Sequence, residues 1–213
     1  MIEFQHQLVI NKLNHFEMKK VLAIVAFVAA LFVAGNVQAQ STIYAGYAPE
    51  TFTYSNSSDN YQGFFAGFTQ NFGLTKGIGV AAGAQVRMNT RSYSAWGVSA
   101  KDSQFLIDVP ILFNYGIAVN RDIKIAPFVG PMVSLALTGN THVDTVLGDG
   151  DSNWYGDNSN MSRFNLYAVF GVDVKFSQFN LFGGYRLGLL DLNSSNNVTL
   201  KTNGFFVGLG YTL

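Results

Sequence analysis

The stretch Phe164-Asn-Leu-Tyr-Ala-Val-Phe-Gly-Val-Asp-Val-Lys-Phe176 places an apolar residue at every second position. The positions between them include Asn165, Gly171, Asp173 and Lys175. A period of two describes a β-strand with two different faces, whereas a helix would scatter the apolar residues around its circumference. The stretch therefore predicts a strand that is apolar on one side.

The same alternation recurs along the chain, which predicts about eight strands. Each predicted strand has close to the roughly 9–11 residues that a strand needs to cross a membrane. The clear segments are 78–88, 105–115, 125–137, 164–176, 181–189 and 205–213, and weaker ones start near Thr42 and Tyr61.

The connections alternate between long polar links and tight turns. The long links are expected at Pro49–Asn60, Thr90–Asp102, Gly139–Ser162 and Asp191–Asn203, and the tight turns at Gly73–Lys76, Asn120–Asp122 and Ser177–Gln178. Long links at one end and short turns at the other are typical of outer-membrane barrels. We therefore predict an all-β fold, a transmembrane antiparallel up-and-down β-barrel with its long loops outside the cell.

The N-terminus predicts export. Lys19 and Lys20 precede the apolar run Val21–Ala34, and small residues lead to an expected cleavage after Ala39. The run is shorter than the roughly 20 residues of a membrane-spanning helix. We expect residues 1–17 to be an upstream extension from a misassigned start, residues 18–39 a signal peptide, and residues 40–213 the barrel.

Composition excludes several classes of function. The chain has no cysteine, which excludes disulfides and thiolate sites, and its net charge of zero gives no footprint for nucleic acid. It has 22 Gly and 19 Phe with only 12% charged residues, which is typical of β-rich proteins and excludes disorder. No cofactor is expected.

Aromatic residues bracket the apolar faces. Phe164 and Phe176 are twelve steps apart, and at about 3.3 Å per step and a tilt of about 40° they span roughly 30 Å of membrane. We predict a membrane girdle of Phe64, Phe72, Phe105, Tyr115, Phe164, Phe176 and Tyr211.

The other face carries glycine and a few charges, which suits a narrow interior. We predict a charge network there made of Arg87, Asp108, Asp173, Lys175 and Arg186. These charges either pair and fill the interior or mark a path for ions, and an eight-stranded barrel is too narrow for a large pore. The alternative is a soluble lipocalin-like barrel, which would turn its apolar face inward.

The long link 139–162 holds the remaining candidate residues. His142 is the mature chain's one histidine, which leaves little scope for a catalytic triad. Asp149, Asp151 and Asn153 place oxygen ligands at every second position, as the start of a calcium loop does. The glycine that should follow and the closing glutamate are missing, so the other interpretation is a solvated acidic loop. The weak candidate metal ligands are Asp149, Asp151, Asn153 and Asp157. The aromatic candidates for partner contact are Trp154 and Tyr155, with Tyr93 and Trp96 in the preceding link, and the alternative place for these four is the membrane interface.

Three stretches resemble the small outer-membrane β-barrel proteins common in Bacteroidota, described as PorT-like or as OmpA-type barrel domains. They are Asp108-Val-Pro-Ile-Leu-Phe-Asn-Tyr-Gly116, Pro127-Phe-Val-Gly-Pro-Met-Val-Ser134 and Gly208-Leu-Gly-Tyr-Thr-Leu213. The resemblance implies that Pro110 is tolerated in mid-strand, at a bulge. The ending departs from the family's pattern, because the last residue is Leu213 where an aromatic residue is read by the barrel assembly machinery.

The sequence thus predicts a non-enzymatic, monomeric outer-membrane protein with a structural role in the envelope or a role in surface interaction. Its expected partners are outer-membrane lipid, the barrel assembly machinery, and a surface or secretion-system protein, with no nucleic acid. The alternatives are a narrow transport channel or secretion-system accessory component, which the resemblance implies, and a soluble ligand-binding barrel.

Overall fold

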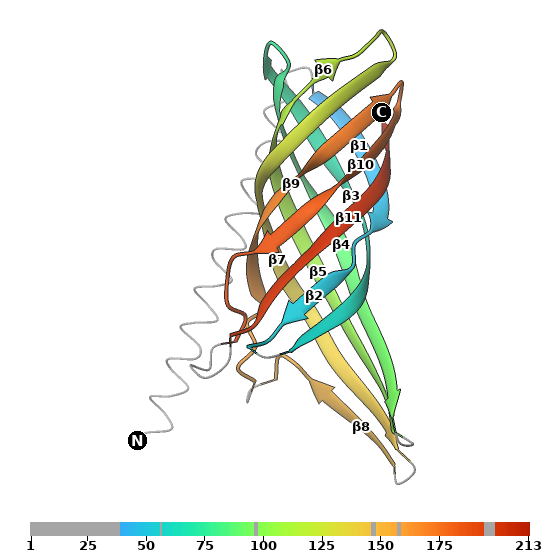
Figure 1. Cartoon of the computed structure of the whole chain (residues 1–213), viewed down its shortest axis with the longest axis vertical. Coiled ribbons are helices and arrows are strands. Elements are labelled where there is room, and N and C mark those ends of the chain that lie inside the picture. The colour runs from blue at the N-terminus through green and yellow to red at the C-terminus, as the bar shows by residue number, and fades with distance from the viewer. Residues whose placement is uncertain (1–38, 56, 96–97, 146–147, 157–158, 194–198) are drawn as a thin grey trace, which may run out of the picture. The chain divides into compact units, whose positions relative to one another are not determined.

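The strands of the computed structural model follow one another around a closed sheet (Figure 1). The structure describes residues 39–55, 57–95, 98–145, 148–156, 159–193 and 199–213. The expected upstream extension and signal peptide, except for Ala39, lie outside the described residues. The strands are β1 (Ala39–Tyr47), β2 (Glu50–Thr53), β3 (Ser58–Thr75), β4 (Ile78–Ala95), β5 (Val98–Tyr115), β6 (Ile117–Ala118), β7 (Ile123–Thr145), β8 (Gly148–Asn153), β9 (Phe164–Phe176), β10 (Phe179–Gly188) and β11 (Lys201–Thr212).

Pairing of the first strand with the last closes the barrel. β1 is antiparallel to β11 on one side and to β3 on the other. β2 continues β1 in the same register, because Tyr47 pairs with Val207 and Thr51 with Asn203. Pro49 interrupts the ladder between them, since proline has no backbone N–H. β1 and β2 together form one wall strand, and β6 and β8 are short additions to β7. The wall strands that result are antiparallel and follow chain order, which confirms the predicted up-and-down barrel.

Two of the three tight turns lie at the expected places, and the first, expected at Gly73–Lys76, lies at Lys76 and Gly77 because β3 continues to Thr75. Lys76 and Gly77 both have positive φ, 40° and 88°, the conformation that joins two twisted strands with a two-residue turn. The Asn120 side chain accepts hydrogen bonds from the N–H groups of Asp122 and Ile123 at 2.9 and 2.8 Å. Ser177 has φ 54° at the third turn.

The four expected long loops are all wrong in part, because strands continue into them; the last one, Asp191–Asn203, contains only the start of β11. The segment Thr90–Asp102 belongs almost entirely to β4 and β5, the link after Gly139 contains the end of β7 and all of β8, and the first link contains β2. The β7–β8 hairpin projects from the end of the barrel opposite the short turns (Figure 1). These extensions carry polar residues on both faces, which is why the alternation that marks the barrel wall disappears there.

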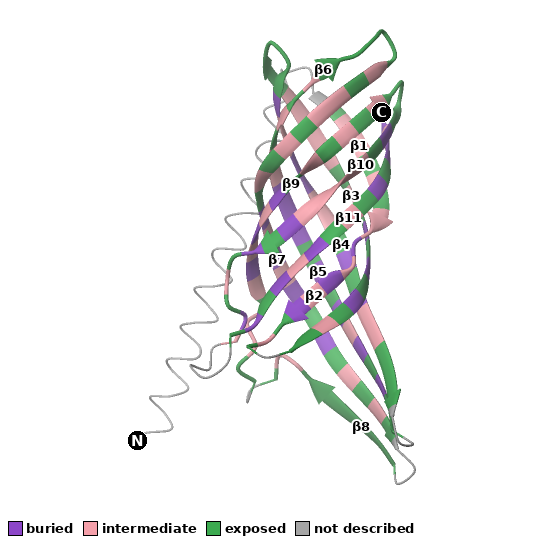
Figure 2. Ribbon diagram, viewed as in Figure 1, coloured by how far each residue is buried: buried purple, intermediate pink, exposed green. Residues whose placement is uncertain are grey.

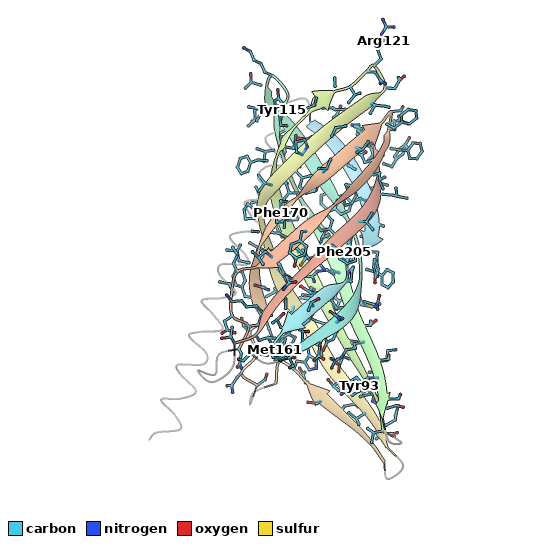
Figure 3. All side chains as sticks on the ribbon, in the orientation of Figure 1. Tyr93, Tyr115, Arg121, Met161, Phe170 and Phe205 are labelled. Carbon is cyan, nitrogen blue, oxygen red and sulfur yellow. The ribbon has the colours of Figure 1, made fainter. Side chains whose placement is uncertain are left out.

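The exposed and buried faces alternate along each wall strand (Figure 2). Outward side chains are apolar, as Phe170 and Phe205 show in Figure 3. The interior holds buried charged residues, Glu50, Arg87, Asp108 and Arg186. A soluble lipocalin-like barrel, by contrast, turns a polar outer face to water.

Four phenylalanine rings inside the barrel each face a glycine on the neighbouring strand. The directly paired residues are Phe65 and Gly46, Phe128 and Gly171, Phe182 and Gly208, and Phe206 and Gly184. At each glycine an added Cβ would lie within 2.9 Å of the ring. The glycines therefore provide the space that the interior rings occupy.

Pro110 does not lie at a bulge. The β4–β5 register is the same before and after it, with Ala82 opposite Ile111 and Gln85 opposite Asp108. Among the described residues, no helix has the length and apolarity to cross a membrane.

Candidate functional site

An ionic cluster fills the barrel interior near the projecting hairpins. The Arg87 guanidinium is fully buried and donates two hydrogen bonds to Asp108, from Nε at 2.8 Å and from Nη2 at 3.2 Å. It also pairs with Glu50 through Nη1. Ser134 Oγ donates to Asp108 at 2.6 Å, so one cation is held between two carboxylates.

A second layer of polar groups surrounds Glu50. Tyr167 donates from its hydroxyl to Glu50 Oε1 at 2.6 Å, and Asn89 donates to Oε2 at 2.6 Å. Arg186 lies on the same side and donates from Nη2 to the carbonyl of Ala48 at 2.7 Å. Buried charges persist in proteins when they are paired and hydrogen-bonded in this way. Paired side chains therefore occupy the interior at this level.

The five predicted lumen charges do not form one network. Arg87, Asp108 and Arg186 lie in or beside the ionic cluster, whereas Asp173 and Lys175 lie near the short turns. There, Asp173 accepts a hydrogen bond from Asn180 at 2.9 Å, and Lys175 donates to Gln40 at 2.9 Å.

Glu50 is the main residue of the cluster that the sequence does not predict. It lies in Pro49–Asn60, which reads as a long link because Pro49 ends the alternation. Yet Glu50 and Phe52 keep the even-numbered inward parity of Thr42 and Tyr44, and that parity is the signal that could have found them.

An aromatic cap covers the ionic cluster at the hairpin end. Its buried core is Phe52, Tyr61, Leu192 and Leu200, and Tyr54, Trp154 and Met161 pack against that core. The Trp154 indole lies 6.4 Å from the Phe52 ring and 6.0 Å from the Tyr61 ring, and its Nε1 donates to Thr141 at 2.7 Å.

The structure places two of the aromatic residues expected to contact a partner in or beside the cap. Trp154 packs into the cap, and the Tyr155 hydroxyl accepts a hydrogen bond from Gln104 Nε2 at 2.6 Å. Both side chains are therefore partly buried at the hairpin end of the barrel. Tyr93 is 48% exposed on the β4 extension, and Trp96 lies outside the described residues.

The candidate metal ligands lie on a strand and form no calcium loop. Asp149, Asp151 and Asn153 belong to β8, which pairs residue by residue with β7, and Asp157 lies outside the described residues. An extended strand keeps alternate side chains in a row, whereas a calcium loop wraps its ligands around the ion. Among the described residues, no group of three His, Asp or Glu side chains could hold a metal.

His142 links the two strands of the projecting hairpin. Its Nδ1 lies 2.7 Å from Asp151 on β8, and its Nε2 lies 3.0 Å from Asp144 on its own strand. The hydrogen bond to Asp151, and then the charges of Asp144 and Asp151, raise the pKa of His142 above its ordinary value. Both ring nitrogens face carboxylates, so neither meets a hydroxyl nucleophile.

The predicted girdle residues form two levels on the outer surface. Phe64, Phe105 and Phe164 lie toward the projecting hairpins, and Phe72, Tyr115, Phe176 and Tyr211 lie toward the short turns. Phe64, Phe105, Tyr115 and Phe176 are between 38% and 58% exposed.

Solved structures with the same architecture exist. The structure is similar to Ail, the attachment invasion locus protein of Yersinia pestis, with a TM-score of 0.50 and 15% identity over 82% of this chain and 98% of that chain. It is equally similar to Ail in complex with the heparin analogue sucrose octasulfate, with a TM-score of 0.51 and 14% identity over 82% and 99%. The chain has the fold of a small outer-membrane β-barrel. Neisserial surface protein A is a further match, with a TM-score of 0.44 and 16% identity over 81% and 97%. No family model and no curated protein matches the chain.

Proposed function

We propose that this protein is a non-enzymatic integral outer-membrane barrel that holds a projecting β-sheet at the cell surface. The observation that carries the proposal is the outer face of the barrel, where apolar residues are exposed on every wall strand. Soluble monomers rarely expose so large an apolar surface, and a closed barrel satisfies the backbone hydrogen bonds that lipid cannot. The same proposal includes outer-membrane lipid as the solvent of the outer face, with the girdle residues at its two edges. It also includes export by a signal peptide, with help from the barrel assembly machinery.

The ionic cluster and the cap favour a closed barrel over a transport channel or a secretion conduit. Arg87, Asp108 and Glu50 are at most 1% exposed, and the cap covers them from the hairpin end. Separating such paired charges costs free energy, so a permanently open path for ions or solutes through the ionic cluster is disfavoured. Planar-bilayer recordings of the whole barrel are expected to show no steady conductance, and stable open channels would contradict this part of the proposal.

The projecting sheet supplies the surface for a partner. It consists of the ends of β4, β5 and β7 together with β8, which pairs only with β7 among the described strands. An edge strand presents unpaired backbone groups that an extended segment can join. Asp149 and Asp151 on this edge are exposed, which favours a segment with basic residues. The same charges disfavour a polyanion of the kind in the Ail complex.

Cysteine labelling tests the membrane part, because the chain has no cysteine of its own. In lipid vesicles, a lipid-soluble maleimide should label Leu166→Cys on the outer face and spare Tyr167→Cys, whose native side chain is 2% exposed. In intact cells, an impermeant maleimide should label Ser152→Cys on β8 and spare Arg121→Cys at a short turn (Figure 3). Recovery as a soluble periplasmic protein, or the reverse labelling, would contradict the proposal.

A further inference from the structure

A cavity of about 160 Å³ lies inside the barrel, on the other side of the ionic cluster from the cap. Its inner end is lined by Gln85 and Arg186, which border the cluster. Its outer end is lined by residues next to the short turns, among them Asn71, Lys124 and Lys175. The cavity is therefore a vestibule that opens toward the short-turn end and stops at the cluster.

The middle of the cavity is an aromatic wall. The Phe65, Phe182 and Phe206 rings lie within 6.1 to 6.5 Å of one another, and Phe128 stacks on Phe206 at 6.3 Å. These are the rings that face the interior glycines. Pockets for small molecules are lined in this way, by apolar and aromatic groups with a few polar groups at fixed places.

The mouth of the cavity carries a pair of like charges. Lys124 on β7 and Lys175 on β9 are direct cross-strand partners, a placement that is unfavourable unless an anion lies between them. Among the described residues, neither lysine forms an ion pair within 4.0 Å. Asp173 is one layer deeper and interacts with both lysines, so the three groups together carry one net positive charge.

The inner end holds an unpartnered buried donor. Arg186 is 2% exposed and lines the cavity, and its Nε has no hydrogen-bond partner among the described residues. A buried N–H without an acceptor costs free energy that a bound acceptor recovers.

We propose that the vestibule binds an amphipathic carboxylate: an apolar, aromatic-sized body with one carboxylate at one end and a hydrogen-bond acceptor at the other. The carboxylate lies between Lys124 and Lys175, the body lies against the phenylalanine wall, and Arg186 Nε donates to the acceptor at the inner end. This site is separate from the projecting sheet and does not depend on surface display.

The probe that matches this description is 3-(4-hydroxyphenyl)propionate, added to the whole barrel in lipid nanodiscs. Methionine methyl NMR reads its binding, because Met132 lines the cavity and is 4% exposed. Met88 faces outward at 46% exposure and Met161 packs in the cap, so both serve as internal references. We expect a saturable shift of the Met132 signal alone.

Matched ligands and variants distinguish binding in the vestibule from nonspecific partition of the probe into lipid or protein. The uncharged amide of the probe should bind at least about tenfold more weakly, the effect of one lost ionic contact. Lys124→Gln with Lys175→Gln should weaken binding similarly, whereas Arg121→Gln, at the same end but outside the cavity, should not. Ala126→Trp should fill the vestibule and abolish the shift, and Ala66→Trp, which faces outward, should leave it unchanged.

Three results would overturn the proposal. One is the absence of any Met132 shift in the unchanged protein. Another is equal binding of the amide and the carboxylate, or a shift at Met88 as large as at Met132, which would mean apolar partition. The third is a Met132 shift that survives both Ala126→Trp and the double lysine change; the two variants are independent, so failure of one to fold leaves the other decisive.

Discussion

The Phe182 ring lies over Gly208, its direct cross-strand partner on β11, with its Cζ atom 2.5 Å from where a Cβ of residue 208 would stand. The backbone of Ala45 approaches the same point at 2.9 Å. The Phe182 ring therefore occupies the space that a side chain at residue 208 would need. Residue 208 cannot be enlarged unless the ring moves or is made smaller.

Replacement of this glycine should destabilise the barrel. Gly208→Ala forces the Phe182 ring or the strand to move, and overpacking of this kind costs about 1–3 kcal/mol. Guanidinium unfolding in lipid vesicles measures the loss. Gly73→Ala is the control, because nothing lies within 4 Å of its added Cβ. Equal stability of the two variants would show that the ring is not confined.

Loss of the central cation should be more damaging. Arg87→Met leaves Glu50 and Asp108 buried without their partner, and breaking a buried pair in this way costs about 3–5 kcal/mol. The same unfolding experiment checks it, with Arg121→Met at an exposed turn as the control. Adding Glu50→Gln and Asp108→Asn to Arg87→Met should recover part of the loss, since the unpaired charges are then removed. No recovery would mean that guanidinium packing, and not charge, stabilises the interior.

The barrel wall could be predicted from sequence because lipid and interior impose different chemistry on successive residues. Phe164–Phe176 alternates for that reason, and the tight turns lie where small and polar residues interrupt the alternation. The projecting ends of β4, β5 and β7 could not be recognised in this way, because water borders both of their faces and both are polar. A polar strand in water and a polar loop have the same composition.

The interior site was only partly predictable for a related reason. Arg87 and Asp108 stand out as charges within apolar alternation. Glu50 follows a proline, and it lies on β2 while Arg87 lies on β4, so their ion pair crosses the intervening strand β3 and leaves no mark in the alternation of either strand. Asp173 and Lys175 are separated from the cluster because they lie closer to the short-turn end of the barrel. The alternation of charges with apolar residues does not show how far along the barrel each charge lies.

The projecting hairpin should loosen as pH rises. The neighbouring carboxylates raise the pKa of His142, so protonated His142 stabilises the β7–β8 pairing fully below the ordinary histidine pKa of 6.5. That contribution is lost as pH rises through the higher folded-state pKa. Imidazole NMR should give a pKa above 6.5, and amide exchange of β8, corrected for the intrinsic effect of pH, should become less protected across this range. Asp151→Asn should lower the His142 pKa, whereas Asp122→Asn, at the opposite end, should not. A titration unmoved by Asp151→Asn would contradict the prediction.

The cap should depend on Phe52, which is 2% exposed with its ring 4.6 Å from that of Tyr61. Phe52→Ala removes a ring that contacts both Tyr61 and Trp154, and truncation of a buried phenylalanine costs about 3–5 kcal/mol. With Trp96→Phe as the background, Trp154 is the remaining tryptophan, so its emission reports the cap directly. Phe52→Ala should move that emission to longer wavelength because water reaches the indole. Phe205→Ala, which removes an outward ring that is 55% exposed, should leave the emission unchanged. If both variants shift the emission equally, Trp154 senses the whole barrel and the cap is not a local structure.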